Sequence, residues 1–226
     1  MQDKKKMIAT YGWLRLLPLI HVSLPVFAFW VFPNGLGIGL GILAFYFIPP
    51  FIGRLTKIQS VDRGIFGPNS KEYWLLISNL VSQNIFNRFP IFEEILRLIP
   101  GLYSIWLRLW GSCVGANVIY HARVEIVDGS YVNIGDNVMF GNGAVIGSHA
   151  MYLDREGNYN FALRTSYVET GTIVAGRSLY MGMDIEKNRK FKAGSTSIFS
   201  LKELKAKDSS LTENAPSIDL GRLQGS

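Results

Sequence analysis

A six-residue repeat occupies the second half of the chain and constrains its fold more than any other feature. Units reading VGANVI, YHARVE and IVDGSY begin at residues 114, 120 and 126, and units reading IGDNVM, FGNGAV and IGSHAM begin at residues 134, 140 and 146. Repetition at a fixed short period indicates a solenoid. Since six residues make one short strand and a turn, three units should close one triangular coil of parallel strands.

Each position of the unit has an expected place in such a prism. The apolar residue that opens a unit should point inward, and the Gly or Asn that follows it should stand where the chain bends and takes a positive φ. The fifth residue is small or β-branched, as a crowded interior requires, at Val118, Val124, Ser130, Val138, Ala144 and Ala150.

The repeat is interrupted once. Residues 151–166 contain no six-residue unit, and alternating residues flank Glu156, Gly157 and Asn158, which predicts a β-hairpin that leaves the prism. Weaker units resume at residues 175, 181 and 193. About four coils are therefore expected between residues 113 and 200, stacked about 4.8 Å apart. Such a short solenoid has open ends, so the segment before it should supply a cap.

A long uncharged run near the N-terminus predicts a membrane segment. Residues 16–53 contain no Asp, Glu, Lys or Arg. About 20 helical residues cross a bilayer core of about 30 Å, so the run suits two passes. The turn formers Pro33, Asn34 and Gly35 lie at its middle, and we expect a helical hairpin with arms over 13–32 and 36–52. Full crossing is preferred; because prolines interrupt both arms, a re-entrant hairpin in one leaflet is the alternative.

Positive charges on both sides of the hairpin favour leaving both of its ends in the cytoplasm, with the prism on the cytoplasmic face of the membrane. They are Lys4, Lys5, Lys6, Arg15, Arg54 and Lys57. The whole chain has 23 Lys plus Arg against 17 Asp plus Glu, a formal net charge of +6. This excess suits anionic lipid headgroups or phosphate-bearing substrates equally. The sequence has no basic run of the nucleic-acid-binding type, so no nucleic-acid partner is expected.

Residues 58–110 read as amphipathic helices that are broken at Pro90 and Pro100. Their aromatic residues suit the boundary between membrane and water, and ordinary packing against the prism is the alternative. Four regions are thus expected: a membrane hairpin with basic flanks (1–57), interfacial helices (58–110), a β-helix with its excursion (111–200), and a short helix with a flexible tail (201–226). The expected fold class is mainly β.

Three stretches of the chain resemble a known family. WLRLWGSCVGANVIYHARVE, VNIGDNVMFGNGAVIGSHAM and the later TIVAG resemble the left-handed β-helix (hexapeptide-repeat) acyltransferases, especially membrane-associated sugar O-acetyltransferases and the β-helix regions attached to nonribosomal-peptide-synthetase-like enzymes. The resemblance implies a left-handed parallel β-helix and a homotrimer with active sites between subunits. It also implies a coenzyme A thioester or a loaded carrier protein as acyl donor, a carrier protein or synthetase as partner, and no tightly bound cofactor.

His149 is the candidate catalytic residue. In the family that the chain resembles, a histidine just after a six-residue unit is the general base, and His149 holds that position. An imidazole titrates near neutral pH and can take the proton of an attacking hydroxyl or amine. Asp154, Glu169 or a backbone carbonyl would orient the ring, and backbone N–H groups near Gly143 or Gly147 would stabilise the oxyanion. The alternative is that the histidine simply stands at a turn of the solenoid.

Several basic and aromatic side chains are candidates for contact with a substrate or a coenzyme, with solvated loops as the alternative. The excursion supplies Arg155, Tyr159 and Arg164, and the late stretch EKNRKFK supplies Lys187, Arg189, Lys190 and Lys192 for coenzyme phosphates or the bilayer surface. Of the two other histidines, His121 is expected at a surface or interface, and His21, in the apolar run, is expected to be packed or to lie near a headgroup. Three histidines therefore do not converge, and no metal site is expected.

The sequence thus predicts a membrane-anchored acyltransferase that moves an acyl group from a thioester to a hydroxyl or amine of a membrane-linked acceptor. The alternative is a non-catalytic membrane scaffold or partner subunit that uses the β-helix for assembly. Regular Ile-Gly units are missing after residue 170, which favours the scaffold because the late coils would not form a coenzyme groove.

Overall fold

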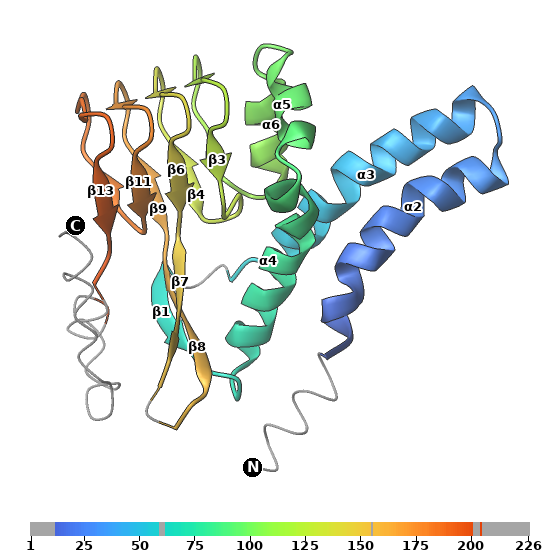
Figure 1. The fold of residues 1–226 in the computed structure, drawn as a ribbon, viewed down its shortest axis with the longest axis horizontal. Coiled ribbons are helices and arrows are strands. Elements are labelled where there is room, and N and C mark those ends of the chain that lie inside the picture. The colour runs from blue at the N-terminus through green and yellow to red at the C-terminus, as the bar shows by residue number, and fades with distance from the viewer. Residues whose placement is uncertain (1–11, 59–61, 155, 201–203, 205–226) are drawn as a thin grey trace.

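The computed structural model describes residues 12–58, 62–154, 156–200 and 204. Its helices are η1 (Gly12–Leu16), α2 (Leu17–Val31), α3 (Gly35–Thr56), α4 (Lys71–Arg88), α5 (Ile91–Arg97) and α6 (Leu102–Leu109). Figure 1 shows a stack of strands with these helices at one end. The helices contain more residues than the strands, so the fold is mixed α and β rather than mainly β as expected. Apart from Leu204, the predicted helix and tail at 201–226 lie outside the described residues.

Three parallel sheets form the stack, and the chain visits them in turn. One sheet contains β2 (Ile119–Tyr120), β5 (Met139–Phe140) and β10 (Ile173–Val174). The second contains β3 (Glu125–Ile126), β6 (Val145–Gly147), β11 (Leu179–Met181) and β13 (Thr196–Ile198). The third contains β4 (Val132–Ile134), β9 (Ser166–Val168) and β12 (Asp184–Ile185). This is the three-sided winding that the six-residue repeat predicts.

The strand register gives the length of each coil. Glu125 pairs with Val145, Val145 pairs with Leu179, and Leu179 pairs with Thr196, so successive coils take 20, 34 and 17 residues. The two-residue offset in the repeat lengthens the first of these coils, and the excursion lengthens the second. The last coil continues the same sheets although its six-residue units are weak in sequence.

The residues that open the six-residue units fill the prism as expected. Five of the six are buried, namely Val114, Ile126, Ile134, Phe140 and Ile146. The sixth, Tyr120, is partly buried and stacks on Phe140 with ring centroids 5.5 Å apart. The hydrophobic core of the prism is therefore the column of side chains that the repeat places inside.

Gly182 and Gly194, which follow the opening residues of late units, take positive φ (60° and 74°) as expected. In the earlier units the glycine after the opening residue has a different cause. A Cβ on Gly135 would lie 2.5 Å from the backbone nitrogen of Thr170, and one on Gly141 would overlap the backbone of the next coil in the same way. Positive φ falls two residues later, at Asn137 (55°) and Gly143 (66°). Close approach between coils thus selects glycine at the second position of these units, and the left-handed corner falls at the fourth, where asparagine and glycine are favoured and where Arg123 also has a positive φ of 59°.

The excursion is a β-hairpin, as predicted, but it begins two residues earlier than expected. Strand β8 (Tyr159–Arg164) pairs on one side with β7 (His149–Leu153) and on the other with β1 (Arg63–Phe66), in an antiparallel sheet. This sheet leaves one corner of the prism, below the stack in Figure 1. His149 is therefore the first residue of the excursion.

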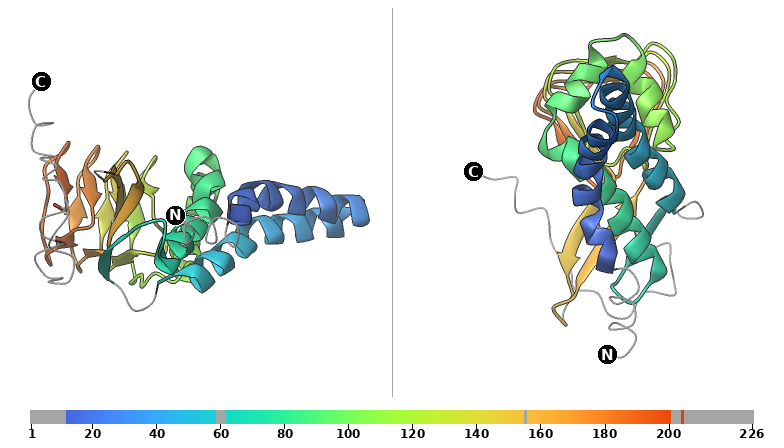
Figure 2. Two further views of the ribbon diagram at one scale, coloured as in Figure 1. Left: turned by 90° about the horizontal axis from the view of Figure 1, so that it is seen from below. Right: turned by 90° about the vertical axis from the view of Figure 1, so that its right-hand side faces the viewer.

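Helices α2 and α3 form the expected hairpin, which projects from the end of the stack (Figures 1 and 2). Asn34 caps α3, because its side chain accepts hydrogen bonds from the backbone N–H groups of Leu36 and Gly37. By length and composition α3 is long and apolar enough to cross a membrane, whereas α2 is a shorter apolar helix of 15 residues.

Two adjacent prolines inside α3 remove backbone donors and so leave two carbonyls without their helical partners. Nε2–H of His21 donates to the carbonyl of Phe45 at 2.9 Å, and Nε1–H of Trp106 donates to the carbonyl of Tyr46 at 2.9 Å. These two side chains satisfy the freed carbonyls where the hairpin meets the other helices. His21 is thus packed in the apolar run, as expected.

The prediction of helices over 58–110 is wrong for Arg63–Phe66, which form strand β1, and the helices begin at Lys71. From there the segment contains two kinds of helix. Helix α4 lies between the hairpin and the prism and buries eight of its residues, so it packs inside the protein rather than at a boundary. Helices α5 and α6 cross the end of the prism (Figure 2) and keep Ile95, Leu98 and Ile105 exposed. The hydroxyl of Tyr103 in α6 donates to the buried carboxylate of Glu93 in α5 at 2.7 Å, which ties the two helices together. The cap at this end of the prism is helical.

Candidate functional site

The offset and the excursion occupy the same corner of the prism in successive coils. Because Ile126 pairs with Ile146, Asp128 lies beside Ser148 in the next coil. The fully buried Asp128 carboxylate accepts hydrogen bonds through Oδ2 from the N–H of Ser148 at 2.5 Å and from the N–H of His149 at 3.1 Å. Its Oδ1 lies 2.7 Å from Nδ1 of His149. The corner therefore holds an Asp–His pair.

This pairing sets the tautomer of the neutral imidazole. A carboxylate can only accept a hydrogen bond, so Nδ1 of His149 carries the proton and Nε2 holds the lone pair. Within the described part of the chain, Nε2 has no hydrogen-bond partner, and the side chain is 21% exposed. The ring of Phe161 lies 5.8 Å away, between centroids. The imidazole thus presents a free basic nitrogen that solvent can reach and is not sealed inside the prism.

The pKa of His149 lies above its ordinary value of 6.5. Burial lowers the pKa of the ring, but the negative charge of Asp128 and its hydrogen bond to Nδ1 raise it by more. Asp128 therefore makes the imidazole a stronger base. It also fixes the orientation of the ring, because its other oxygen is tied to two backbone N–H groups.

Helix α4 holds the loop that carries Asp128. The side chain of Gln83 donates to the carbonyl of Ile126 at 2.6 Å and accepts from the N–H of Gly129 at 2.8 Å. Asn79 Nδ2 donates to Ser130 Oγ at 2.8 Å. Both α4 side chains are fully buried, so the loop on either side of Asp128 has little freedom.

The two carboxylates expected to orient His149 do other things. Asp154 shapes the tip of the hairpin, where it accepts from the backbone N–H groups of Glu156 and Asn158. Its pKa is lowered by these and other hydrogen bonds within the hairpin. Glu169 is exposed beyond the end of β9. Asp128 takes the place predicted for both.

Of the two glycines expected to offer oxyanion donors, the structure brings only Gly147 to the pair. A Cβ on Gly147 would lie 3.3 Å from Oδ2 of Asp128. The N–H of Gly143 already donates to the carbonyl of Ala122 at 3.0 Å, in a different corner. Gly143 is therefore not available as a donor at this site.

Of the three candidate contact residues on the excursion, the two that the structure describes lie at different distances from His149 along the hairpin. Arg155 lies outside the described residues. Tyr159 is exposed at the start of β8, four strand positions from the residue that pairs with His149. Arg164 ends β8 close to the site, since its N–H donates to the carbonyl of Ser148 at 2.8 Å, and its side chain pairs with Asp184 at 2.8 Å.

The late basic residues lie far along the stack. Lys187, Arg189, Lys190 and Lys192 are all exposed around the last coil. Figure 1 places that coil at the end of the stack opposite the helices and their hairpin. The geometry therefore does not favour contact between this stretch and a bilayer reached by the hairpin. His121 is exposed, as expected. The described residues contain no group of three or more His, Cys, Asp or Glu that could hold a metal ion.

Asp128 is the site residue that sequence reasoning missed. The signal for it was present, because the two-residue offset lengthens one coil to 20 residues and so sets residue 128 beside residue 148. A search for carboxylates one coil away from the histidine would have found it. The search along the chain after His149 could not, because β7 carries those residues away from the prism.

Comparisons with known proteins give only weak support for any relationship. No family model matches the chain, and no curated protein matches it. Among solved structures, the chain is similar to serine acetyltransferase isoform 3 from Entamoeba histolytica in complex with cysteine, with 13% sequence identity, over 81% of this chain and 70% of that chain, at a TM-score of 0.20. A TM-score this low does not establish a common fold or a common activity.

Proposed function

We propose that the chain is a membrane-anchored acyltransferase with a left-handed β-helix, and that His149 is its general base. The observation that carries this proposal is the Asp128–His149 pair, which leaves Nε2 unprotonated and accessible. Such a pair suits removal of a proton from a nucleophile. The resemblance of the six-residue repeat to acyltransferases supports a thioester as the electrophile.

In the proposed reaction an acceptor hydroxyl or amine loses its proton to Nε2 of His149 as its oxygen or nitrogen attacks the thioester carbonyl. A C–O or C–N bond forms, the C–S bond breaks, and the imidazolium returns the proton to the leaving thiolate. Asp128 stabilises the imidazolium by charge. Base catalysis of this kind contributes about 10²–10⁴-fold.

The donor is proposed to be an acyl-coenzyme A, used as a co-substrate, with a loaded carrier protein as the other candidate. We further propose a homotrimer, as the resemblance implies, on the cytoplasmic face of the membrane. The acceptor is proposed to be membrane-linked, because the apolar hairpin and the prism belong to one chain. The basic residues Arg54 and Lys57, at the end of α3, support the cytoplasmic orientation.

A non-catalytic scaffold is the competing function, but the structure weakens the reason for it. The late coils look irregular in sequence, yet β11 and β13 pair in parallel and β12 pairs with β9. The chain after residue 170 therefore continues the winding of the earlier coils, which supports a groove along the stack.

Thermal unfolding of the full chain in detergent, with coenzyme A and separately with a loaded acyl-carrier protein, distinguishes the two functions. Specific binding to the folded state raises the melting temperature as the ligand concentration exceeds its Kd. Stabilisation by either donor supports the transferase. If neither donor stabilises the chain over a wide concentration range, the proposal is wrong and the scaffold remains.

A further inference from the structure

How far the hairpin can enter a bilayer depends on its free length, not on the full length of its helices. Helix α3 has 22 residues and α2 has 15, or about 33 Å and about 22 Å at about 1.5 Å per residue. Part of each helix, however, is packed against the other helices of the protein. Only the part beyond those contacts is free to meet lipid.

Contacts with the other helices begin near His21 in α2 and at Phe45 in α3. The ring of His21 lies 5.4 Å from that of Phe86 in α4. The ring of Phe45 lies 4.8 Å from that of Phe92 in α5. One residue further along α3, the hydroxyl of Tyr46 donates to the carbonyl of Phe92 at 3.0 Å. The base of the hairpin is therefore built into the protein from these residues onward.

The free part of the hairpin comprises residues 22–31 and 35–44. Ten helical residues in each arm extend about 15 Å, and the hydrocarbon core of a bilayer is about 30 Å thick. The surface of these arms is apolar: Val26 is 66% exposed, Trp30 77% and Leu36 58%. Neither arm contains an ionisable residue of the Asp, Glu, Lys or Arg type. The arms are thus suited to lipid but reach only about half way through it.

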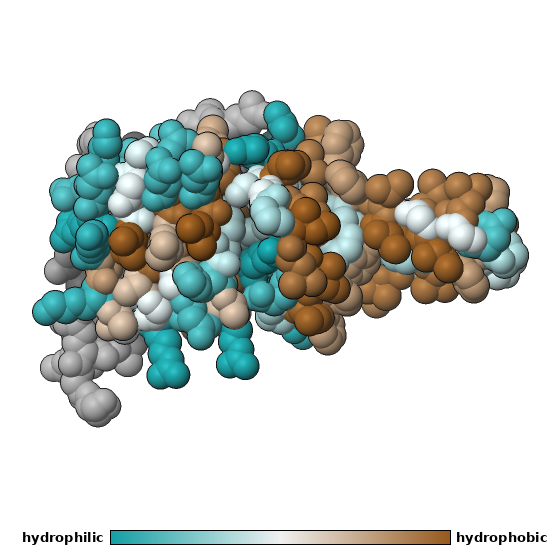
Figure 3. Space-filling model, turned by 90° about the horizontal axis from the view of Figure 1, so that it is seen from above, coloured by the Kyte–Doolittle hydropathy of each residue, from teal (hydrophilic) through white to brown (hydrophobic). Residues whose placement is uncertain are grey.

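We propose that the α2–α3 hairpin enters one leaflet only, with its tip near the bilayer midplane, and that α5 and α6 lie on the surface of that leaflet. Figure 2 shows these two helices crossing the end of the prism from which the hairpin leaves. In Figure 3 the hydrophobic surface of the hairpin continues onto this end of the molecule. The exposed apolar residues there are Phe89, Ile91, Ile95, Leu98, Ile99 and Ile105.

The positions of three exposed arginines fit this placement, because all three lie outside the part of the hairpin that would enter the hydrocarbon. The exposed cations Arg54, Arg88 and Arg108 lie at the ends of α3, α4 and α6, outside the free arms. Guanidinium groups in such positions can meet anionic headgroups of the near leaflet. At the tip, the Asn34 side chain is already bonded to the N–H groups of Leu36 and Gly37, which satisfies donors that lipid could not.

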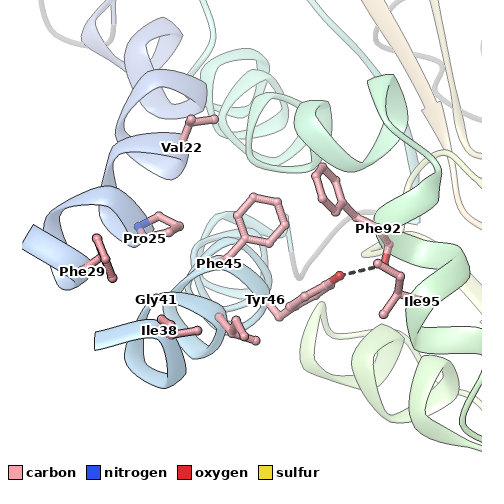
Figure 4. A pocket seen from close by; sticks show the side chains of 10 residues that line it. Val22, Pro25, Phe29, Ile38, Gly41, Phe45, Tyr46, Phe92 and Ile95 are labelled. Atoms are coloured by element: carbon pink, nitrogen blue, oxygen red, sulfur yellow. Dashed lines mark hydrogen bonds between the residues drawn. The ribbon is translucent and has the colours of Figure 1, made fainter. Parts of the chain in front are cut away.

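A groove between the free arms of the hairpin and α5 gives the lipid a defined place. This groove of about 620 Å³ lies between α2, α3 and α5 and is lined by residues that include Pro25, Ile38, Phe45 and Ile95 (Figure 4). The hydroxyl of Tyr46, the one polar side-chain group in its lining, is turned to the carbonyl of Phe92. In water this apolar hollow would be unfavourable, and a hydrocarbon chain of the near leaflet fills it.

Cysteine labelling in sealed lipid vesicles tests the placement. The exposed native Cys113 is the control, and the test variant is Gly35→Cys in a Cys113→Ser background, because a side chain at Gly35 meets nothing within 4 Å. A membrane-impermeant maleimide is supplied on both sides of vesicles that contain the full chain. Cys113 should react, and the tip cysteine should react only after detergent is added. Reaction of the tip cysteine in intact vesicles, from either side, overturns the proposal.

Tryptophan quenching gives the depth directly. The emission of Trp30 is obtained as the difference between the fluorescence of wild type and of Trp30→Phe. It is measured in vesicles whose lipids carry bromine either near the headgroup or near the end of the acyl chain. A tip at the midplane is quenched most by the deep bromines, whereas a hairpin that crosses would place Trp30 near the far headgroups and favour the shallow ones. Both measurements rest on the membrane attachment in the proposed function and need no activity, so their failure is separate from a failure of acyl transfer.

Discussion

At the scale of single residues, Asp128 determines which nitrogen of His149 carries the proton. In Asp128→Asn, the single amide oxygen is best used to accept from the N–H groups of Ser148 and His149, which turns the NH₂ group toward Nδ1. The ring must then place its proton on Nε2, and its basic nitrogen is lost. We expect the transfer rate to fall by about 10²–10⁴-fold. A rate within a few-fold of wild type, in a folded variant, would show that Asp128 does not orient the base.

The pH dependence of the rate follows from the same pair. A general base acts unprotonated, so the rate should rise with pH through the pKa of His149, with its midpoint above 6.5 because Asp128 raises that pKa. In Asp128→Asn the attraction is removed while burial still lowers the pKa. The midpoint of whatever activity remains should therefore move to lower pH. A pH profile of kcat/KM that keeps the wild-type midpoint in the variant would contradict this assignment.

At the scale of elements, helix α4 should govern the geometry of the site without touching a substrate. Gln83→Leu removes the two hydrogen bonds that flank Asp128 and leaves a buried carbonyl and a buried N–H unpaired, at a cost of about 1–3 kcal/mol each. We expect a lower melting temperature and a lower kcat with little change in KM for the donor. Asn87→Ala is the control, since it removes only an exposed hydrogen bond of 3.3 Å to the neighbouring carbonyl of Val127. Equal effects on KM and kcat in Gln83→Leu would place Gln83 in substrate binding instead.

Two glycines near one corner of a coil, Gly141 and Gly143, should differ in how well they tolerate a side chain. Gly141→Ala sets a methyl group against the backbone of the next coil and should destabilise the chain by about 1–3 kcal/mol. Gly143→Asn, two residues away, should be nearly neutral, because asparagine already adopts positive φ at the fourth position of other units. Thermal unfolding of both variants checks the distinction. Equal destabilisation would mean that the corner conformation, rather than the approach of the next coil, selects both glycines.

At the scale of the whole molecule, the sequence was enough to predict the repeating coils and the apolar helical hairpin. The six-residue units predicted the three-sided winding, and the uncharged run predicted the hairpin, because both patterns follow directly from strand and helix periods. The pairing of Asp128 with His149 could not be read from neighbours in the chain, since it depends on the lengths of two successive coils. The role of α4 was missed for a related reason: its apolar residues suit both a membrane surface and a protein interior, and only the packing shows the interior. The free length of the hairpin could not be predicted either, because it depends on where the other helices pack against α2 and α3.

The role of His149 is tested most simply by the rate at which the full chain, in lipid vesicles, releases thiol from acetyl-coenzyme A and from a loaded acyl-carrier protein. His149→Ala is compared with wild type and with His121→Ala, which changes an exposed histidine elsewhere in the prism. If His149 is the general base, His149→Ala loses at least about 10²-fold in rate while remaining folded, and His121→Ala keeps the wild-type rate. Wild-type thiol release in a folded His149→Ala variant would contradict this role.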